Sequence, residues 1–266
     1  MSAGVALEVR GAEFAYPGRP PALDGVDLDC APGTLTCLLG PNGSGKSTLL
    51  RLLAGVVAPA RGVVRVGGVE PARQPRSELA RRLAFLPAAP QVPADYPTRA
   101  VVLMGRHPFG RGLLLDTPAD RALADAALAR CGAAPFAERV CVDLSGGERQ
   151  RVLIARTVCQ DAPAVLLDEP TSAQDLAHVQ DLFALFADLA REGRTVVVAT
   201  HALNAAARAA DRLVFLAGGR KVADGPPAEV FEAETLRAAF GVEVLLGRDG
   251  ELPYAVPRGR APGGAA

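Results

Sequence analysis

Short apolar runs recur along the chain and predict buried parallel strands. Each is rich in leucine or valine and bounded by turn residues, a pattern typical of strands that are covered on both faces. Alternation of apolar and polar positions near the N-terminus predicts a small antiparallel sheet instead. The continuous runs are residues 35–39, 83–86, 164–167 and 195–200, the alternating stretches are 5–9, 25–30 and 63–66, and a last hairpin is expected at 212–223.

Helices are predicted where apolar residues fall three and four positions apart. Residues 47–54 have this spacing, and Gly55 follows at a position that ends helices. Thr117 can cap another helix, with Pro118 at its first position and Asp120 in its first turn. Further helices are expected over residues 77–82, 145–160 and 226–240.

The order of these elements predicts one α/β domain with two additions. A proline-rich linker precedes an alanine-rich helical stretch, so residues of about 90–160 are expected to form a helical insertion subdomain. The alternating strands define a β subdomain at about residues 1–35 and 60–75. We therefore predict a single domain over residues 1–250, followed by a flexible tail at 251–266.

One loop carries the clearest chemistry. Residues 40–48 match the G-x-x-x-x-G-K-[ST] pattern between a predicted strand and a predicted helix. Backbone N–H groups and the helix dipole then converge on one point, which favours a phosphate-binding loop. The alternative is an ordinary glycine-rich turn before a helix. The residues expected to bind nucleotide phosphates are Gly40, Asn42, Gly43, Ser44, Gly45, Lys46, Ser47 and Thr48.

Lys46 is unusual in this composition. Lysine and arginine together number 29, yet Lys46 and Lys221 are the only lysines. A lysine in the loop therefore indicates a role for a compact point charge, such as reaching between two phosphates, that a planar guanidinium fills badly.

Acidic residues and a histidine follow two of the predicted core strands. Asp168 and Glu169 end the run at 164–167, beside the expected phosphate loop, where Mg²⁺ is held. We predict Asp168 as a metal ligand and Glu169 as the group that orients and deprotonates an attacking water; the alternative is a pair of solvated turn residues. His201 ends the run at 195–200, at the sheet edge where open α/β folds bind ligands.

Two further positions leave alternatives open. Tyr16 lies in a proline- and glycine-rich turn, where its ring could stack on a purine or merely cover the sheet edge. Residues 145–148 read Ser-Gly-Gly-Glu, which has capping-box spacing. This second helix N-terminus that contains glycines could bind another anion, or its residues could only cap the helix.

Composition narrows the classes of function. Basic and acidic residues number 29 each, so a nucleic-acid partner is not indicated. Five scattered cysteines favour buried thiols in a reducing compartment over a disulfide framework or a zinc site. The start of the chain lacks a secretory pattern and no apolar run reaches the ~18–20 residues of a spanning helix. We expect a soluble, cytoplasmic protein that serves a membrane only through partners.

These motifs, in this order, make the sequence resemble an ABC transporter ATP-binding subunit over about residues 5–245. Residues 144–150 resemble the family signature, 164–169 the Walker B strand, and 171–175 the D-loop, with Gln174 where leucine is common. The resemblance implies a P-loop NTPase (RecA-like) core. It also implies a head-to-tail homodimer in which ATP lies between the phosphate loop of one copy and the signature of the other.

The family carries over roles to matching residues. In this resemblance Lys46, Glu169 and His201 are catalytic, Tyr16 stacks on adenine, and Mg²⁺ is bound by Ser47 and Asp168. The partner copy's nucleotide is contacted through Ser145, Gly146, Gly147 and Asp175.

Residues 98–109, 175–178 and 201–204 resemble importer ATPases for iron-siderophore, heme and cobalamin. This implies a peripheral subunit at the cytoplasmic face of the inner membrane, working with permease subunits and an extracytoplasmic substrate-binding protein. Where the family places a glutamine that relays the permease state, this chain has Ala88, with Gln91 three residues later. Other readings are an ATPase of another transporter type, a ribosome- or DNA-acting cassette, and a nucleotide-binding subunit with impaired hydrolysis.

Overall fold

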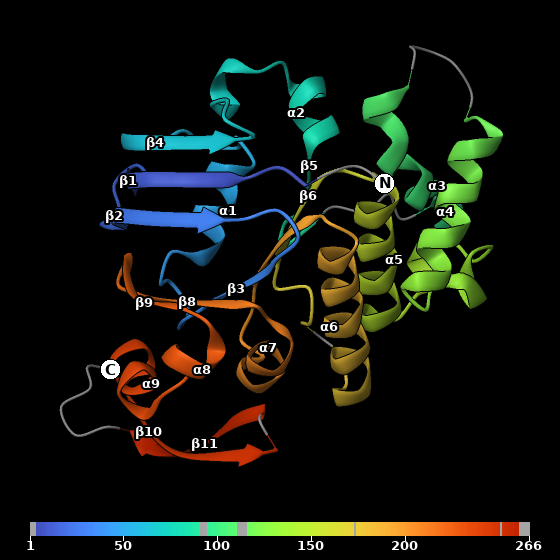
Figure 1. The fold of residues 1–266 in the computed structure, drawn as a ribbon. Coiled ribbons are helices and arrows are strands. Elements are labelled where there is room, and N and C mark those ends of the chain that lie inside the picture. The colour runs from blue at the N-terminus through green and yellow to red at the C-terminus, as the bar shows by residue number, and fades with distance from the viewer. Residues whose placement is uncertain (1–3, 91–94, 111–115, 173, 251, 261–266) are drawn as a thin grey trace.

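The continuous apolar runs form neighbouring strands of the main sheet. The computed structural model describes residues 4–90, 95–110, 116–172, 174–250 and 252–260. Within them the sheet has the order β5-β6-β7-β3-β8-β9, parallel except for β9, which pairs antiparallel with β8 (Figure 1). The strands are β3 (Leu35–Leu39), β5 (Leu83–Leu86), β6 (Ala164–Asp168), β7 (Thr195–Ala199), β8 (Arg212–Ala217) and β9 (Arg220–Gly225).

Both faces of β3, β5, β6 and β7 are covered, which explains why these strands read as largely apolar runs. Within β3, Leu38 faces one hydrophobic cluster, whereas Cys37 and Leu39 face the other. The first cluster also contains the inner face of an antiparallel sheet in the order β2-β1-β4, together with helix α1. These elements are β1 (Leu7–Ala15), β2 (Pro21–Cys30), β4 (Arg61–Val66) and α1 (Lys46–Leu53).

Helices cover the other face and extend into a helical subdomain on the far side from the antiparallel sheet (Figure 1). Arg106 joins two parts of this subdomain, because its guanidinium bonds Asp120 at 2.8 Å and the Gln160 carbonyl at 2.9 Å. The α-helices are α2 (Arg76–Arg82), α3 (Thr98–Leu103), α4 (Pro118–Arg130), α5 (Gly146–Cys159), α6 (Leu176–Arg191), α7 (Leu203–Ala209), α8 (Pro227–Val230) and α9 (Ala233–Phe240). The 3-10 turns are η1 (Pro71–Arg73), η2 (Met104–Phe109), η3 (Ala134–Phe136) and η4 (Cys141–Asp143).

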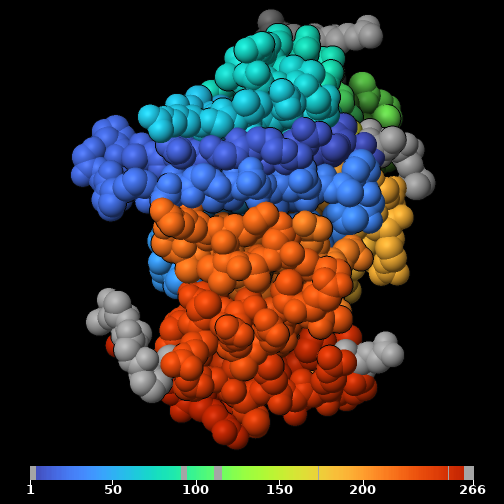
Figure 2. Space-filling view, turned by 60° about the vertical axis from the view of Figure 1, so that its left-hand side comes forward, coloured from blue at the N-terminus to red at the C-terminus, as the bar shows by residue number. Residues whose placement is uncertain are grey.

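The C-terminal segment differs from the flexible tail that its composition predicts. β10 (Val242–Asp249) and β11 (Leu252–Arg260) form an antiparallel hairpin, seen at the bottom of Figure 1. The physical reason is that β11 is hydrogen-bonded to α7. The Asn204 side chain accepts from the Ala255 N–H at 2.9 Å and donates to the Ala255 carbonyl at 3.2 Å. In Figure 2 this hairpin belongs to the red region at the bottom of the molecule, below the orange residues 212–225.

Two expectations from composition can be compared with the described residues. All five cysteines lie within them, buried and without a disulfide, as predicted. Burial raises the pKa of the Cys131 thiol to about 12, so this thiol is not a reactive thiolate. None of the described helices is both long and apolar enough to cross a membrane.

Candidate nucleotide-binding site

The loop between β3 and α1 is built on two glycines that no other residue can replace without strain. Gly45 caps α1 with φ 107°, and a Cβ there would lie 2.6 Å from the Ala22 carbonyl oxygen. Gly40 has φ 149°, and its Cβ would collide with the Leu216 carbonyl. The loop therefore fits tightly between β2 and β8, with its backbone free to approach a ligand.

Lys46 begins α1 and is only 5% exposed. Its Nζ donates to the carbonyl oxygens of Gly40 at 2.7 Å and Pro41 at 3.0 Å, so the ammonium is held at the mouth of the loop. Burial lowers the pKa of Lys46, while the charges of Glu169 and Asp168 oppose that shift. A cation positioned by two backbone carbonyls suits an anionic ligand better than it suits a solvated surface.

Ser47 in the first turn of α1 meets Asp168 at the carboxyl end of β6. The Ser47 Oγ donates to Asp168 Oδ1 at 2.9 Å, and Asp168 is fully buried at the end of β6. Its Oδ2 has no hydrogen-bond partner among the described residues. Burial raises the pKa of Asp168, against the Ser47 hydrogen bond and the Arg51 charge. A buried carboxylate oxygen without a hydrogen-bond partner is costly. The carboxylate and the neighbouring hydroxyl are oxygen donors of the kind that Mg²⁺ prefers, so these residues fit that ion.

Glu169 occupies a strained position next to this pair. Its φ of 52° lies in the left-handed region, and its N–H donates to the Ala199 carbonyl at 2.9 Å. Such strain in a non-glycine residue is typical of functional sites. Its Oε1 lies 3.0 Å from His201 Nε2, so the ends of β6 and β7 converge here.

The two side chains have shifted acidities. Burial raises the pKa of Glu169, opposed by the Lys46 charge. Burial, together with Lys46, lowers the pKa of His201, which therefore stays neutral at neutral pH. The arrangement provides a carboxylate of raised basicity beside a neutral imidazole, as general base catalysis needs.

A cleft of about 630 Å³ opens over these groups. Tyr16 lines it from the turn before β2, packed edge-to-face on Phe14 at 4.9 Å, with its hydroxyl accepting from Arg51 at 2.9 Å. The ring therefore packs against the end of β1 and lines the cleft. Sequence reasoning missed the Arg51 contact and the lining residues Arg19, Ala22 and Ser172; the turn composition around Tyr16 was the available signal for Arg19.

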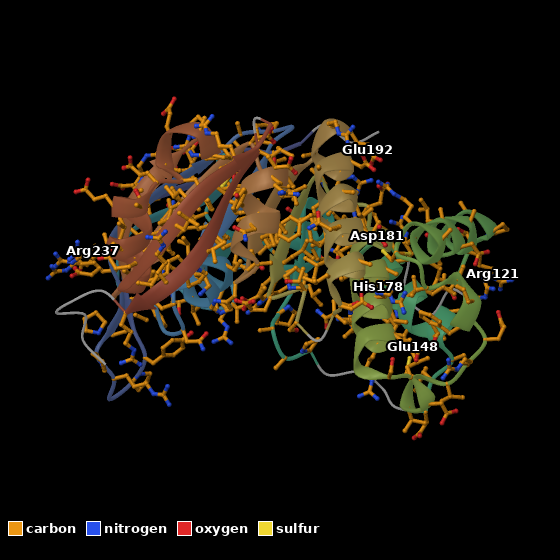
Figure 3. All side chains as sticks on the ribbon, turned by 90° about the horizontal axis from the view of Figure 1, so that it is seen from below. Arg121, Glu148, His178, Asp181, Glu192 and Arg237 are labelled. Atoms are coloured by element: carbon orange, nitrogen blue, oxygen red, sulfur yellow. The ribbon has the colours of Figure 1, made fainter. Side chains whose placement is uncertain are left out.

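The remaining predicted residues do not line this cleft. Ser145 caps α5 in a capping box, with its Oγ accepting from the Glu148 N–H at 3.3 Å. Gly146 and Gly147 continue into α5, and Asp175 caps α6. Figure 3 shows Glu148 at this end of α5, in the helical subdomain. Gln91 lies outside the described residues.

The ABC transporter family profile matches residues 23–172, more than half of the chain, including the phosphate loop and the acidic end of β6. The chain belongs to the ABC transporter family. As an ABC cassette it is 45% identical over 237 residues to the hemin import ATP-binding protein of Streptomyces coelicolor, covering 89% of this chain and 84% of that one.

A second relative is longer. The chain is 43% identical over 244 residues to the cobalamin import ATP-binding protein of Halobacterium salinarum, covering 91% of this chain and 61% of the relative. This ABC cassette thus spans less than two thirds of that protein's length.

Solved structures agree with the fold. An inward-facing structure described as a metal-chelate type ABC transporter superposes with TM-score 0.81 at 30% identity, covering 96% of this chain and 97% of that one. A dimeric bacterial ABC transporter cassette gives TM-score 0.76 at 27% identity, covering 83% and 98%. The predicted α/β fold with a P-loop NTPase core is confirmed.

Proposed function

We propose that this ABC cassette binds and hydrolyses ATP to drive uptake of an iron complex, heme or cobalamin through a membrane permease. The observation that carries the proposal is the convergence of Lys46, Glu169 and His201 on one cleft, with Ser47 and Asp168 paired beside them. The hemin and cobalamin import relatives support the substrate class.

The residues of the cleft divide the work. The loop amides and Lys46 bind the phosphates of ATP, and the Tyr16 ring stacks on the base. Mg²⁺ held by Ser47 and Asp168 would neutralise charge on the β- and γ-phosphates. Glu169 accepts the proton of the attacking water, and neutral His201 donates its single N–H from Nε2 either to Glu169, as in this structure, or to the γ-phosphate once ATP is bound.

A second copy completes the site. Ser145, Gly146 and Gly147 lie at an exposed helix start away from the cleft, so within one chain they have no access to its nucleotide. In a head-to-tail homodimer they face the other copy's phosphates, and the solved dimeric cassette of the same fold supports the pairing of two copies. We place the dimer peripherally at the cytoplasmic face of the inner membrane, with a substrate-binding protein on the other side.

Copurification and transport test this function together. The chain, expressed with its permease, is expected to copurify and to give ATP-dependent uptake of heme, a ferric siderophore or cobalamin into proteoliposomes carrying a binding protein. Uptake of none of the three, from a complex that still hydrolyses ATP, would reject the substrate class and leave the ATPase standing.

Ala88 favours a second candidate, a cassette that binds ATP with slowed or uncoupled hydrolysis. Ala88 lines the cleft and offers no polar side chain to water or metal. We expect Ala88→Gln to raise phosphate release about twofold to tenfold, the effect of one added hydrogen bond. The neighbouring exposed Ala89 provides the control Ala89→Gln. Unchanged ATPase and transport in Ala88→Gln would show that the missing amide does not limit turnover.

A further inference from the structure

The turn before α6 and the first turn of α6 are tied to α5 by two side-chain links. Gln174 Nε2 donates to the Gly147 carbonyl at 2.9 Å. Separately, His178 on α6 contacts Asp175 Oδ1 through Nδ1 at 2.8 Å and Arg151 Nη1 through Nε2 at 3.0 Å. The D-loop segment, here Gln174 and Asp175, is thereby joined within one chain to the helix that carries the signature.

The chemistry of the second link determines where the His178 proton lies. An arginine guanidinium has only donors, so Nε2 must accept from Arg151. The ring proton then lies on Nδ1, which donates to Asp175. The same Asp175 oxygen also accepts the His178 backbone N–H at 2.9 Å as the cap of α6. In the series Arg151, His178 and Asp175, every hydrogen bond therefore pairs a donor with an acceptor.

Both ends of the link are held by packing. The Arg151 guanidinium lies 5.3 Å from the centre of the Phe136 ring, which fixes it against the helical subdomain. Arg151, His178 and Asp181 border a groove of about 580 Å³ between α4, α5 and α6. Figure 3 shows His178 and Asp181 where α6 meets the helical subdomain. The groove separates α6 from the helical subdomain beside the link.

We propose that His178 and Gln174 are positioning residues that make the D-loop segment and residues 145–147 move as one unit. The inference rests on the proposed function, because both segments then reach the partner copy's nucleotide together. His178 touches neither ATP nor the attacking water in this arrangement; it acts through Asp175 and Arg151. Loss of either link would let the helical subdomain move without carrying Asp175.

The proton position can be measured without nucleotide. In ¹⁵N-labelled protein at pH 8, the ring nitrogen shifts of His178, assigned by its substitution among the three histidines, report the tautomer. We expect the Nδ1–H form, and Arg151→Met should release it toward the Nε2–H form favoured by free imidazole side chains. An Nε2–H tautomer in the unsubstituted protein would overturn the proposal.

Paired substitutions test the positioning role. His178→Asn keeps a donor toward Asp175 and loses the acceptor for Arg151, whereas His178→Gln keeps the distal position and loses the Asp175 contact. Both, together with Gln174→Leu, should lower kcat about threefold to tenfold, the effect of losing one hydrogen bond. KM for ATP should change less than twofold, because the phosphate loop is untouched. Gln180→Ala, at an exposed position of α6, is the control and should leave both constants unchanged.

The outcomes separate the two proposals. Unchanged kcat in both His178 variants and in Gln174→Leu would overturn the positioning role, whatever the tautomer. A protein with no ATPase activity at all would instead overturn the proposed function, and the tautomer measurement would still decide whether the link exists. An equal rise of KM in all three variants would indicate loss of ATP binding and would also count against positioning.

Discussion

Glu169→Gln is expected to abolish phosphate release while leaving ATP binding intact. The substitution keeps the shape of the side chain and the contact with His201, but an amide cannot accept the proton of the attacking water. A positioned general base contributes ~10²–10⁴-fold to a rate, so we expect a loss of that order in Mg²⁺-dependent phosphate release. Binding of a fluorescent ATP analogue should change less than twofold, because Lys46 and the loop amides are unaltered.

Glu234→Gln, the same chemical change at an exposed position of α9, is the matched control and should retain full activity. The pH profile adds a second readout. Because burial raises the pKa of Glu169, the ionised base is lost as pH falls through a higher value than that of a solvated glutamate, and activity should decline there. A Glu169→Gln protein with more than a tenth of normal activity would refute this residue as the base.

Lys46→Ala is expected to weaken ATP binding by roughly tenfold to a hundredfold, and with it hydrolysis. A hydrogen bond to a charged group contributes ~1.5–3 kcal/mol, and Lys46 is buried with its ammonium already aimed at the mouth of the loop. Lys46→Arg should also lose most of the binding, because a planar fork does not fit between the Gly40 and Pro41 carbonyls. Equilibrium binding of labelled ATP measures both variants.

The chain offers a matched control in its other lysine. Lys221 lies on β9, bonded to Asp224 at 2.8 Å, and Lys221→Ala should bind ATP normally. Thermal unfolding of each variant shows whether the fold persists. Lys46→Ala binding ATP as tightly as the unsubstituted chain, with its fold intact, would contradict a phosphate role for this residue.

Much of the fold and of the site could be predicted because both are encoded locally. The runs around Leu38 and Leu167 are largely apolar because both faces of β3 and β6 are covered. The glycines at positions 40 and 45 mark a turn that no side chain would fit. Asp168 and Glu169 follow a core strand directly, so the topology of parallel strands brings them to one edge with the loop and His201.

Other features depend on contacts between segments that are remote in sequence, and no local sequence pattern predicts these features. Residues 252–260 look like a tail by composition, yet their strand forms because Asn204, some fifty positions earlier, bonds both backbone groups of Ala255. The Tyr16 hydroxyl is held by Arg51 across the β subdomain. The separation of Ser145 from the cleft likewise follows from how the helical subdomain packs.

The sequence by itself thus determined the family, the strand and helix pattern, and the residues offered to a nucleotide, because periodicity and motif spacing are properties of consecutive residues. Only the tertiary structure decided which of those residues share a cleft and which lie outside it. It alone also joined Arg151, His178 and Asp175 into one chain of hydrogen bonds. The physical reason is that these hydrogen bonds and buried contacts join elements that are distant in sequence. They depend on how the elements pack together, which no single stretch of residues specifies.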